Sequence, residues 1–129
     1  MNLSNGETIS ANYLDDLVVA IYRRLDSMQP PPQPGKDPRR FFFDTPFFNS
    51  QMSLLTDTEL QYQGTTFKRS EVNYLGQGMW SAAAGESVGQ ALALVEEYKQ
   101  EYWGEPATPG VIFWTTFGYD AYNRLSLSP

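Results

Sequence analysis

Two glutamates flank a glycine-rich segment in the second half of this chain of 129 residues, and they are the acids best placed for carboxylate chemistry. Glu71 precedes the segment and Glu86 follows it. Paired carboxylates cleave a glycosidic bond when they lie within about 10 Å of each other. An intervening helix that rises about 1.5 Å per residue would hold these two roughly 20 Å apart. A carboxylate-dependent hydrolase acting on glycan, with Glu71 or Glu86 as its acid, is therefore kept as an alternative only.

The absence of cysteine and histidine narrows the chemistry further. Thiol nucleophiles, disulfides, zinc knuckles and imidazole acid–base steps are all excluded. A metal would have to be held by oxygen ligands, which suits calcium or magnesium. No segment has the alternating acids and glycine of an EF-hand loop. We expect no metal site and no cofactor.

Three polar residues, Asn73, Gln77 and Ser81, are spaced by four and share one face of the helix expected over residues 71–84. One interpretation is the floor of a binding site. The same helix carries Gly76 and Gly78, each of which costs about 1 kcal/mol relative to alanine and so calls for a compensating role. Small residues let a second backbone approach closely, so we favour a tightly packed central helix.

Aromatic residues make up 15% of the chain and supply the other candidate binding residues. Trp103 and Trp114 are predicted to be partly exposed, because each adjoins a helix end or a polar residue. Phe47 and Phe48 end a phenylalanine-rich run over residues 41–48. This run either packs into the core or forms an exposed patch for a partner, and core packing is favoured because a chain of this size needs the rings.

The charge balance argues against nucleic acid as a partner. The net charge is −6, and residues 81–129 carry six acids against two basic residues. Such a surface repels phosphate backbones. The basic cluster of Lys36, Arg39 and Arg40 is predicted to be a solvated loop rather than a phosphate site.

The first half of the chain predicts a helix, a stiff connection and a small hairpin. Apolar residues recur at spacings of three and four from Leu14 to Met28, which is typical of one helical face, and Pro30 ends the pattern. Residues 29–38 contain five prolines and predict a connecting loop on the surface; a docking peptide for an aromatic groove is the alternative. Residues 60–67 alternate loosely around Gly64, as a β-hairpin does.

The second half predicts three helices in close succession. The first ends at Gly85 in a left-handed conformation. The second begins with Ser87 and Gln90 in a capping box and ends at Gly104. The third begins at Thr108-Pro109 and ends at Gly118. We therefore expect one globular domain over residues 1–129, mainly α or else α+β with one small hairpin, in which an N-terminal amphipathic helix packs on a compact C-terminal three-helix unit.

Two stretches resemble C-terminal modules of bacterial Rhs/YD-repeat and related polymorphic-toxin proteins. They read SEVNYLGQGM over residues 70–79 and FWTTFGY over residues 113–119, and the resemblance covers residues 60–122. It implies a variable module at the end of a larger secreted protein, such as a toxin or effector. It implies no catalytic residue here, and the lack of histidine departs from the nuclease toxins of that group. The first 50 residues carry no resemblance.

The leading functional prediction is a non-catalytic protein-binding or accessory module of a bacterial secretion or polymorphic-toxin-type system, with a protein partner. The alternatives are the glycan hydrolase and a structural subunit of an oligomeric assembly buried through residues 41–48. No apolar run reaches the roughly 18 residues of a membrane span. The N-terminus lacks the pattern of a signal peptide, so we expect either a cytoplasmic protein or one exported within a larger chain. The oligomeric state is left open.

Overall fold

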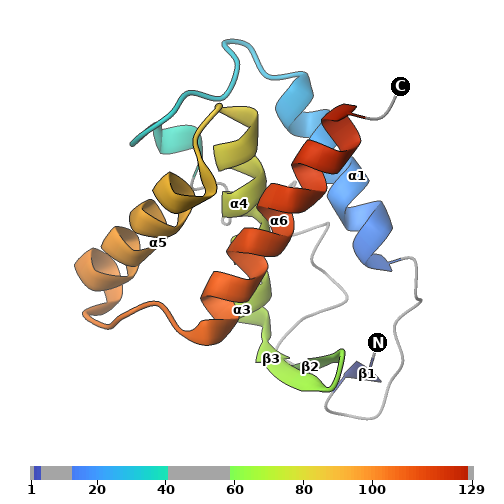
Figure 1. Ribbon diagram of the computed structural model, residues 1–129, viewed down its shortest axis with the longest axis vertical. Helices are drawn as coiled ribbons and strands as arrows, with labels where there is room; N and C mark the ends of the chain where they lie inside the picture. The colour runs from blue at the N-terminus through green and yellow to red at the C-terminus, as the bar shows by residue number, and fades with distance from the viewer. Residues whose placement is uncertain (1, 4–12, 41–58, 128–129) are drawn as a thin grey trace.

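The computed structural model describes residues 2–3, 13–40 and 59–127. The helices in these ranges are α1 (Tyr13–Asp26), the 3-10 turn η1 (Pro38–Arg40), α3 (Arg69–Val72), α4 (Tyr74–Ala83), α5 (Val88–Trp103) and α6 (Pro109–Leu127). The strands are β1 (Asn2–Leu3), β2 (Glu59–Tyr62) and β3 (Thr65–Lys68). The prediction of a mainly helical fold with a small hairpin is confirmed, and Figure 1 shows α1 and α5 on opposite sides of the central pair α4 and α6.

Helix α1 follows the predicted apolar pattern. Its buried residues recur at the spacing of one helical face and are Leu14, Leu17, Val18, Ile21 and Leu25. The acids Asp15 and Asp16 are exposed in its first turn. The buried face packs on α4 and α6, and the Tyr22 ring lies 4.9 Å from the ring of Tyr122 on α6. The amphipathic pattern therefore positions the N-terminal helix on the C-terminal helices, as predicted.

The hairpin forms where the alternation predicted it. Gln63 and Gly64 make a two-residue turn with φ of 50° and 80°, the mirror-image geometry that matches strand twist and favours glycine. Leu60 on β2 lies opposite Phe67 on β3, and both side chains are buried. Strand β1 adds a third antiparallel strand beside β2, which the sequence pattern did not predict.

Helices α4 and α6 cross so closely that glycine is required on both. A Cβ atom at Gly78 would lie 1.8 Å from the carbonyl oxygen of Thr115 on α6. A Cβ atom at Gly118 would lie 1.8 Å from the carbonyl oxygen of Leu75 on α4. The tightly packed central helix is thus confirmed. The prediction that α6 ends at Gly118 is wrong, because this glycine serves the helix contact and α6 continues to Leu127.

The predicted boundaries of α5 and the predicted start of α6 are confirmed by their capping contacts. The single helix expected over residues 71–84 is wrong, because the structure divides it at Asn73 into α3 and α4. The Ser87 hydroxyl accepts from the Gln90 amide at 3.1 Å, and the Gln90 side chain accepts from the Ser87 amide at 2.8 Å. Gly104 ends α5 in the left-handed region with φ of 64°. The Thr108 hydroxyl accepts from the Val111 amide at 3.2 Å, at the start of α6. These local signals fix where α5 and α6 begin and the turn between them.

Candidate functional site

The predicted polar stripe is divided between two environments. Gln77 and Ser81 are buried, and both contact the buried guanidinium of Arg40. Arg40 Nη2 donates to Ser81 Oγ at 2.7 Å, its Nε donates to Gln77 Oε1 at 3.2 Å, and Gln77 Nε2 donates back to the Arg40 carbonyl at 2.6 Å. Gln77 and Ser81 therefore bind this protein's own arginine.

Arg40 also corrects the prediction of a solvated basic loop. Its side chain is 1% exposed and its Nη2 lies 3.2 Å from Oε1 of Glu86, whose side chain is 4% exposed. The other Glu86 oxygen accepts from the Gly35 amide at 2.9 Å. A buried guanidinium needs such a partner, because an uncompensated charge in the interior is costly. Oε2 of Glu86 is thus hydrogen-bonded within the protein, whereas Oε1 is ion-paired with Arg40 but has no hydrogen-bond partner among the described residues.

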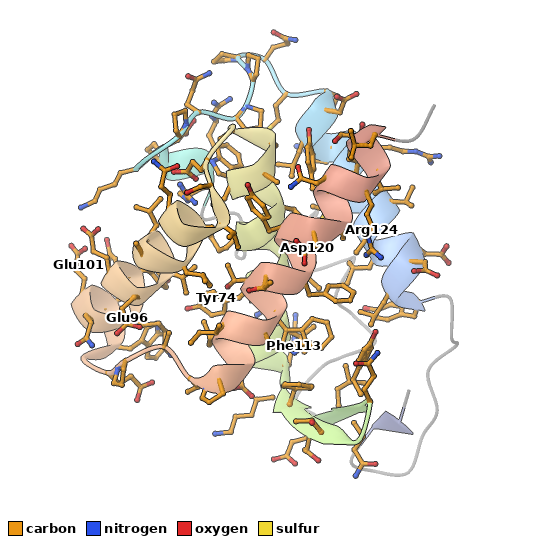
Figure 2. The ribbon with its side chains drawn as sticks, in the orientation of Figure 1. Tyr74, Glu96, Glu101, Phe113, Asp120 and Arg124 are labelled. Atoms are coloured by element: carbon orange, nitrogen blue, oxygen red, sulfur yellow. The ribbon has the colours of Figure 1, made fainter. Side chains whose placement is uncertain are left out.

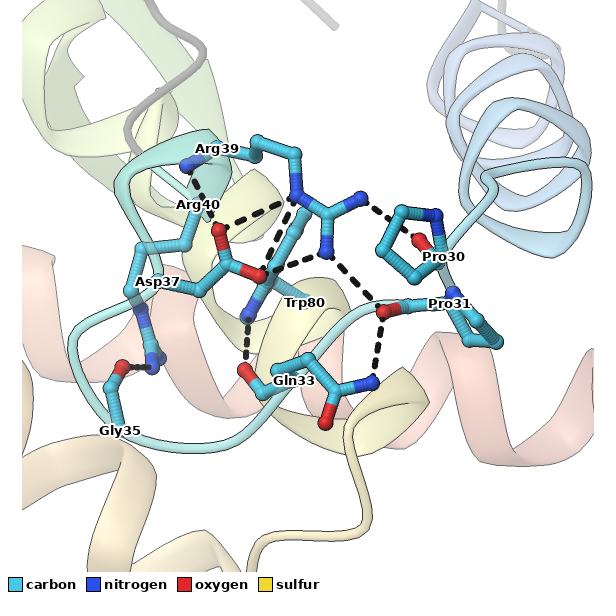
Figure 3. A network of polar contacts seen from close by, with 8 residues as sticks. All are labelled: Pro30, Pro31, Gln33, Gly35, Asp37, Arg39, Arg40 and Trp80. Carbon is cyan, nitrogen blue, oxygen red and sulfur yellow. Dashed lines mark hydrogen bonds and ion pairs between the residues drawn. The ribbon is translucent and has the colours of Figure 1, made fainter.

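The rest of the proline-rich segment is folded onto α4 in the same way (Figure 3). The Trp80 indole N–H donates to the Gln33 carbonyl at 3.1 Å, and the Arg39 guanidinium lies 5.5 Å above the Trp80 ring. Arg39 also pairs with Asp37 at 2.6 Å, and this contact holds the pKa of the Asp37 carboxyl below its ordinary value. Segment 29–40 therefore covers one end of α4 with a fixed backbone.

Glu71, the other predicted acid, caps two helices. Its Oε1 accepts from the Lys68 amide at 3.0 Å and its Oε2 accepts from the Thr108 hydroxyl at 2.7 Å. A Cβ atom at Gly110 would lie 2.1 Å from Glu71 Oε2, so the carboxylate packs directly on the start of α6. Glu71 and Glu86 lie beyond opposite ends of α4 and engage different partners. The structure does not bring them together as an acid–base pair.

The remaining predicted site residues have separate outcomes. Trp114 is fully buried, which corrects the prediction of partial exposure: its ring packs against Tyr62, Phe67 and Phe117 beneath the hairpin. Trp103 is 64% exposed, as predicted. Asn73 lies between α3 and α4, and its buried Oδ1 has no hydrogen-bond partner among the described residues.

Phe47 and Phe48 lie outside the described residues. The prediction that places them at a partner interface is therefore left as it was made from the sequence.

The most accessible aromatic surface of the described chain lies on α5. Only Ala91 and Val95 are buried among its 16 residues, whereas eight of the ten residues of α4 are buried. Tyr102 is 66% exposed, and its ring lies 4.8 Å from the Tyr98 ring at an interplanar angle of 39°. We use the name α5 surface for Glu97, Tyr98, Glu101, Tyr102 and Trp103.

Acidic side chains alternate with these rings. Glu97 and Glu101 are one helical turn apart, as are Tyr98 and Tyr102, so the two pairs run side by side along α5. Both acids are exposed, and Glu101 extends outward from α5 in Figure 2. The signal that could have identified this surface is the matching i,i+4 spacing of acids and tyrosines on one helix.

A cleft of about 320 Å³ opens beside this surface, between α5 and the proline-rich segment. Its lining residues are Gly35, Lys36, Pro38 and Arg40 of that segment, Tyr74 and Gln77 of α4, and Leu94, Val95, Glu97, Tyr98, Glu101 and Tyr102 of α5. A second hollow, of about 430 Å³, shares Tyr74 and Tyr98 with the cleft and extends to Trp103. Both hollows therefore adjoin the α5 surface.

Comparison of the chain with protein-family models, curated proteins and solved structures gives no match. Within the described ranges, none of the helices is long and apolar enough to cross a membrane. The same ranges contain no group of three or more acids that could hold a metal ion. The α5 surface is the candidate binding site of the described chain.

Proposed function

We propose that this protein is a non-catalytic binding module whose α5 surface takes a basic segment of a partner protein. The observation that carries the proposal is the exposure of Tyr102 and Trp103, at 66% and 64%, on a helix of which only two residues are buried. Tyrosine and tryptophan are the residue types that contribute most to protein interfaces when a partner covers them. An exposed pair of this kind favours an interaction site.

The negative charge of Glu97 and Glu101 on the α5 surface supports a basic partner. Glu97 and Glu101 flank the tyrosines, whereas Glu105, in the turn after α5, is paired with Lys99 at 3.1 Å. Complementary charge around an aromatic centre speeds association and selects against acidic partners. Lys99 lies 5.5 Å over the Trp103 ring, so this ring already accepts a cation on its face. A partner segment with lysine or arginine beside apolar side chains matches both properties.

The alternatives have less support. Glu71 and Glu86, the acids of the glycan-hydrolase alternative, are both committed to contacts inside the protein. The assembly alternative depends on residues 41–48, which lie outside the described ranges. The bacterial secretion or toxin-type setting stays a prediction that rests on the C-terminal resemblance alone.

The test is selection of binders from a random peptide library, followed by affinity measurements on soluble peptides. We expect the selected peptides to carry a net positive charge and apolar residues, and to bind more weakly as salt is added. The variant Tyr102→Ala with Trp103→Ala should weaken binding by about 30-fold, the effect of losing about 2 kcal/mol of interface energy.

The matched control is Leu127→Ala, which removes another exposed apolar side chain, at the end of α6. It should leave the affinity within about twofold, because a lone exposed leucine away from the α5 surface takes no part in the contact. Selection of acidic peptides, or equal losses in both variants, would contradict the proposal.

A further inference from the structure

The cleft beside the α5 surface already contains a cation of the protein's own. Lys36 Nζ lies 2.6 Å from Oε1 of Glu97. Glu97 first, and then Glu101 and Tyr102, raise the pKa of this ammonium above its ordinary value. Three residues of the cleft thus act together on one primary ammonium group.

The charged groups that face the cleft carry more negative than positive charge, which favours binding of another cation. Arg40 also lines it, but its guanidinium is engaged by Glu86. Glu97 is paired with Lys36, whereas Glu101 has no salt bridge among the described residues. Two exposed carboxylates therefore face one exposed ammonium, and the excess charge of the cleft is negative.

Lys36 can leave the cleft without any movement of the backbone. The Gly35 amide is held by Glu86, and the Asp37 side chain accepts from the Arg39 amide at 3.0 Å, so the chain is fixed on both sides of Lys36. The Lys36 side chain is 69% exposed, and Glu97 is its only salt-bridge partner in the described chain. Ion pairs with this exposure contribute little to stability, so rotation of one side chain into water would free the carboxylates.

We infer that the cleft is a binding site for one lysine side chain of the partner, and that Lys36 occupies this site in the free protein. This inference rests on the proposed function and specifies what the α5 surface recognises. The incoming ammonium meets Glu97 and Glu101, while its aliphatic chain lies along Tyr98 and Tyr102. Lysine side chains bury their methylene groups against such rings and keep the charged end at the rim.

The experiment measures the affinity of a blocked, fluorescently labelled oligolysine peptide by anisotropy. Lys36→Gln removes the internal competitor and should tighten binding by about threefold to fivefold, as expected for an exposed ion pair. Arg23→Gln makes the same change in net charge on α1, a helix that lies across α4 and α6 from α5 (Figure 1), and should change the affinity by less than about twofold. Glu97→Gln with Glu101→Gln should weaken binding by about tenfold.

A second measurement follows Lys36 itself. On addition of oligolysine to the unmodified protein, the side-chain NMR signals of Lys36 should move toward those of a solvated lysine. Circular dichroism of each variant checks that the fold is retained.

The outcomes separate the two proposals. If oligolysine binds and the Tyr102→Ala, Trp103→Ala variant loses it, but Lys36→Gln behaves as Arg23→Gln does and the Lys36 signals stay fixed, the lysine site is wrong and the binding module stands. If oligolysine does not bind, or binds independently of Tyr102 and Trp103, the proposed function fails together with the lysine site.

Discussion

Replacing Gly118 by alanine tests the close crossing of α4 and α6. The added Cβ atom would lie 1.8 Å from the Leu75 carbonyl oxygen, whereas an unstrained carbon–oxygen contact is about 3.3 Å. The two helices would have to separate locally by roughly 1.5 Å, and the obstructing atom is backbone, which cannot rotate away. Overpacking of this kind costs about 1–3 kcal/mol, and the rigid neighbour places this case at the upper end.

Helix propensity acts in the opposite direction, since alanine is favoured over glycine by up to about 1 kcal/mol. We expect Gly118→Ala to lower the free energy of unfolding by about 2 kcal/mol, which corresponds to a fall in Tm of roughly 8 °C for a chain of this size. The assay is urea and thermal unfolding followed by circular dichroism at the helix band.

Gly89→Ala on α5 is the matched control. Its Cβ atom would meet nothing closer than the Ser87 hydroxyl oxygen, at 3.8 Å, which is an ordinary contact. Propensity alone then acts, and this variant should be as stable as the parent or more stable by up to about 1 kcal/mol. If Gly118→Ala is as stable as Gly89→Ala, the reasoning about the helix crossing is refuted.

Three further predictions concern buried or capped charges. Arg40→Met should destabilise the protein by about 3–5 kcal/mol in urea unfolding, because it leaves Glu86 as an unpaired buried charge. Adding Glu86→Gln should restore part of this loss. If Arg40→Met alone is as stable as the parent protein, the reasoning is contradicted. Glu71→Ala removes the acceptor shared by two helix starts and should cost about 1–2 kcal/mol in the same assay, with no loss counting against the capping role. The pKa values of Asp37 and Glu96 are held below their ordinary 3.8 and 4.5, by Arg39 and by the Ala107 amide. The free energy of unfolding should therefore be constant between about pH 5 and pH 8 and fall as the pH drops through the folded-state values; a urea series against pH showing no fall would contradict this.

The sequence was informative wherever a signal is local. Ser87 and Gln90 lie within one helical turn, and their capping box was predictable from their spacing. Arg40 was misjudged because its partners Gln77 and Ser81 lie 37 and 41 residues away, and no local pattern distinguishes a buried arginine from a solvated one. Gly118 was read as a helix end because a glycine has the same appearance in sequence whether it ends a helix or admits another backbone.

The candidate site could be predicted only in part, again because local signals are visible in the sequence and long-range contacts are not. Trp103 was expected at the surface because it lies at a helix end, and it is there. The sequence does not indicate the relation of Glu97 and Glu101 to Lys36, because it appears only when the proline-rich segment folds back beside α5. Pairings across such a connection depend on tertiary structure, and periodicity along one helix does not reveal them.

The three tryptophans form two classes of intrinsic fluorescence reporter, one buried and one exposed. Trp80 and Trp114 are fully buried, so their fluorescence should be emitted toward the blue and should resist quenching by iodide. Trp103 stands in solvent on the α5 surface and should emit toward the red and be quenched. A ligand that covers α5 would protect the quenchable fraction alone, whereas loss of the fold would expose the whole emission. Ligand binding to the α5 surface and unfolding of the protein can therefore be followed separately in one sample.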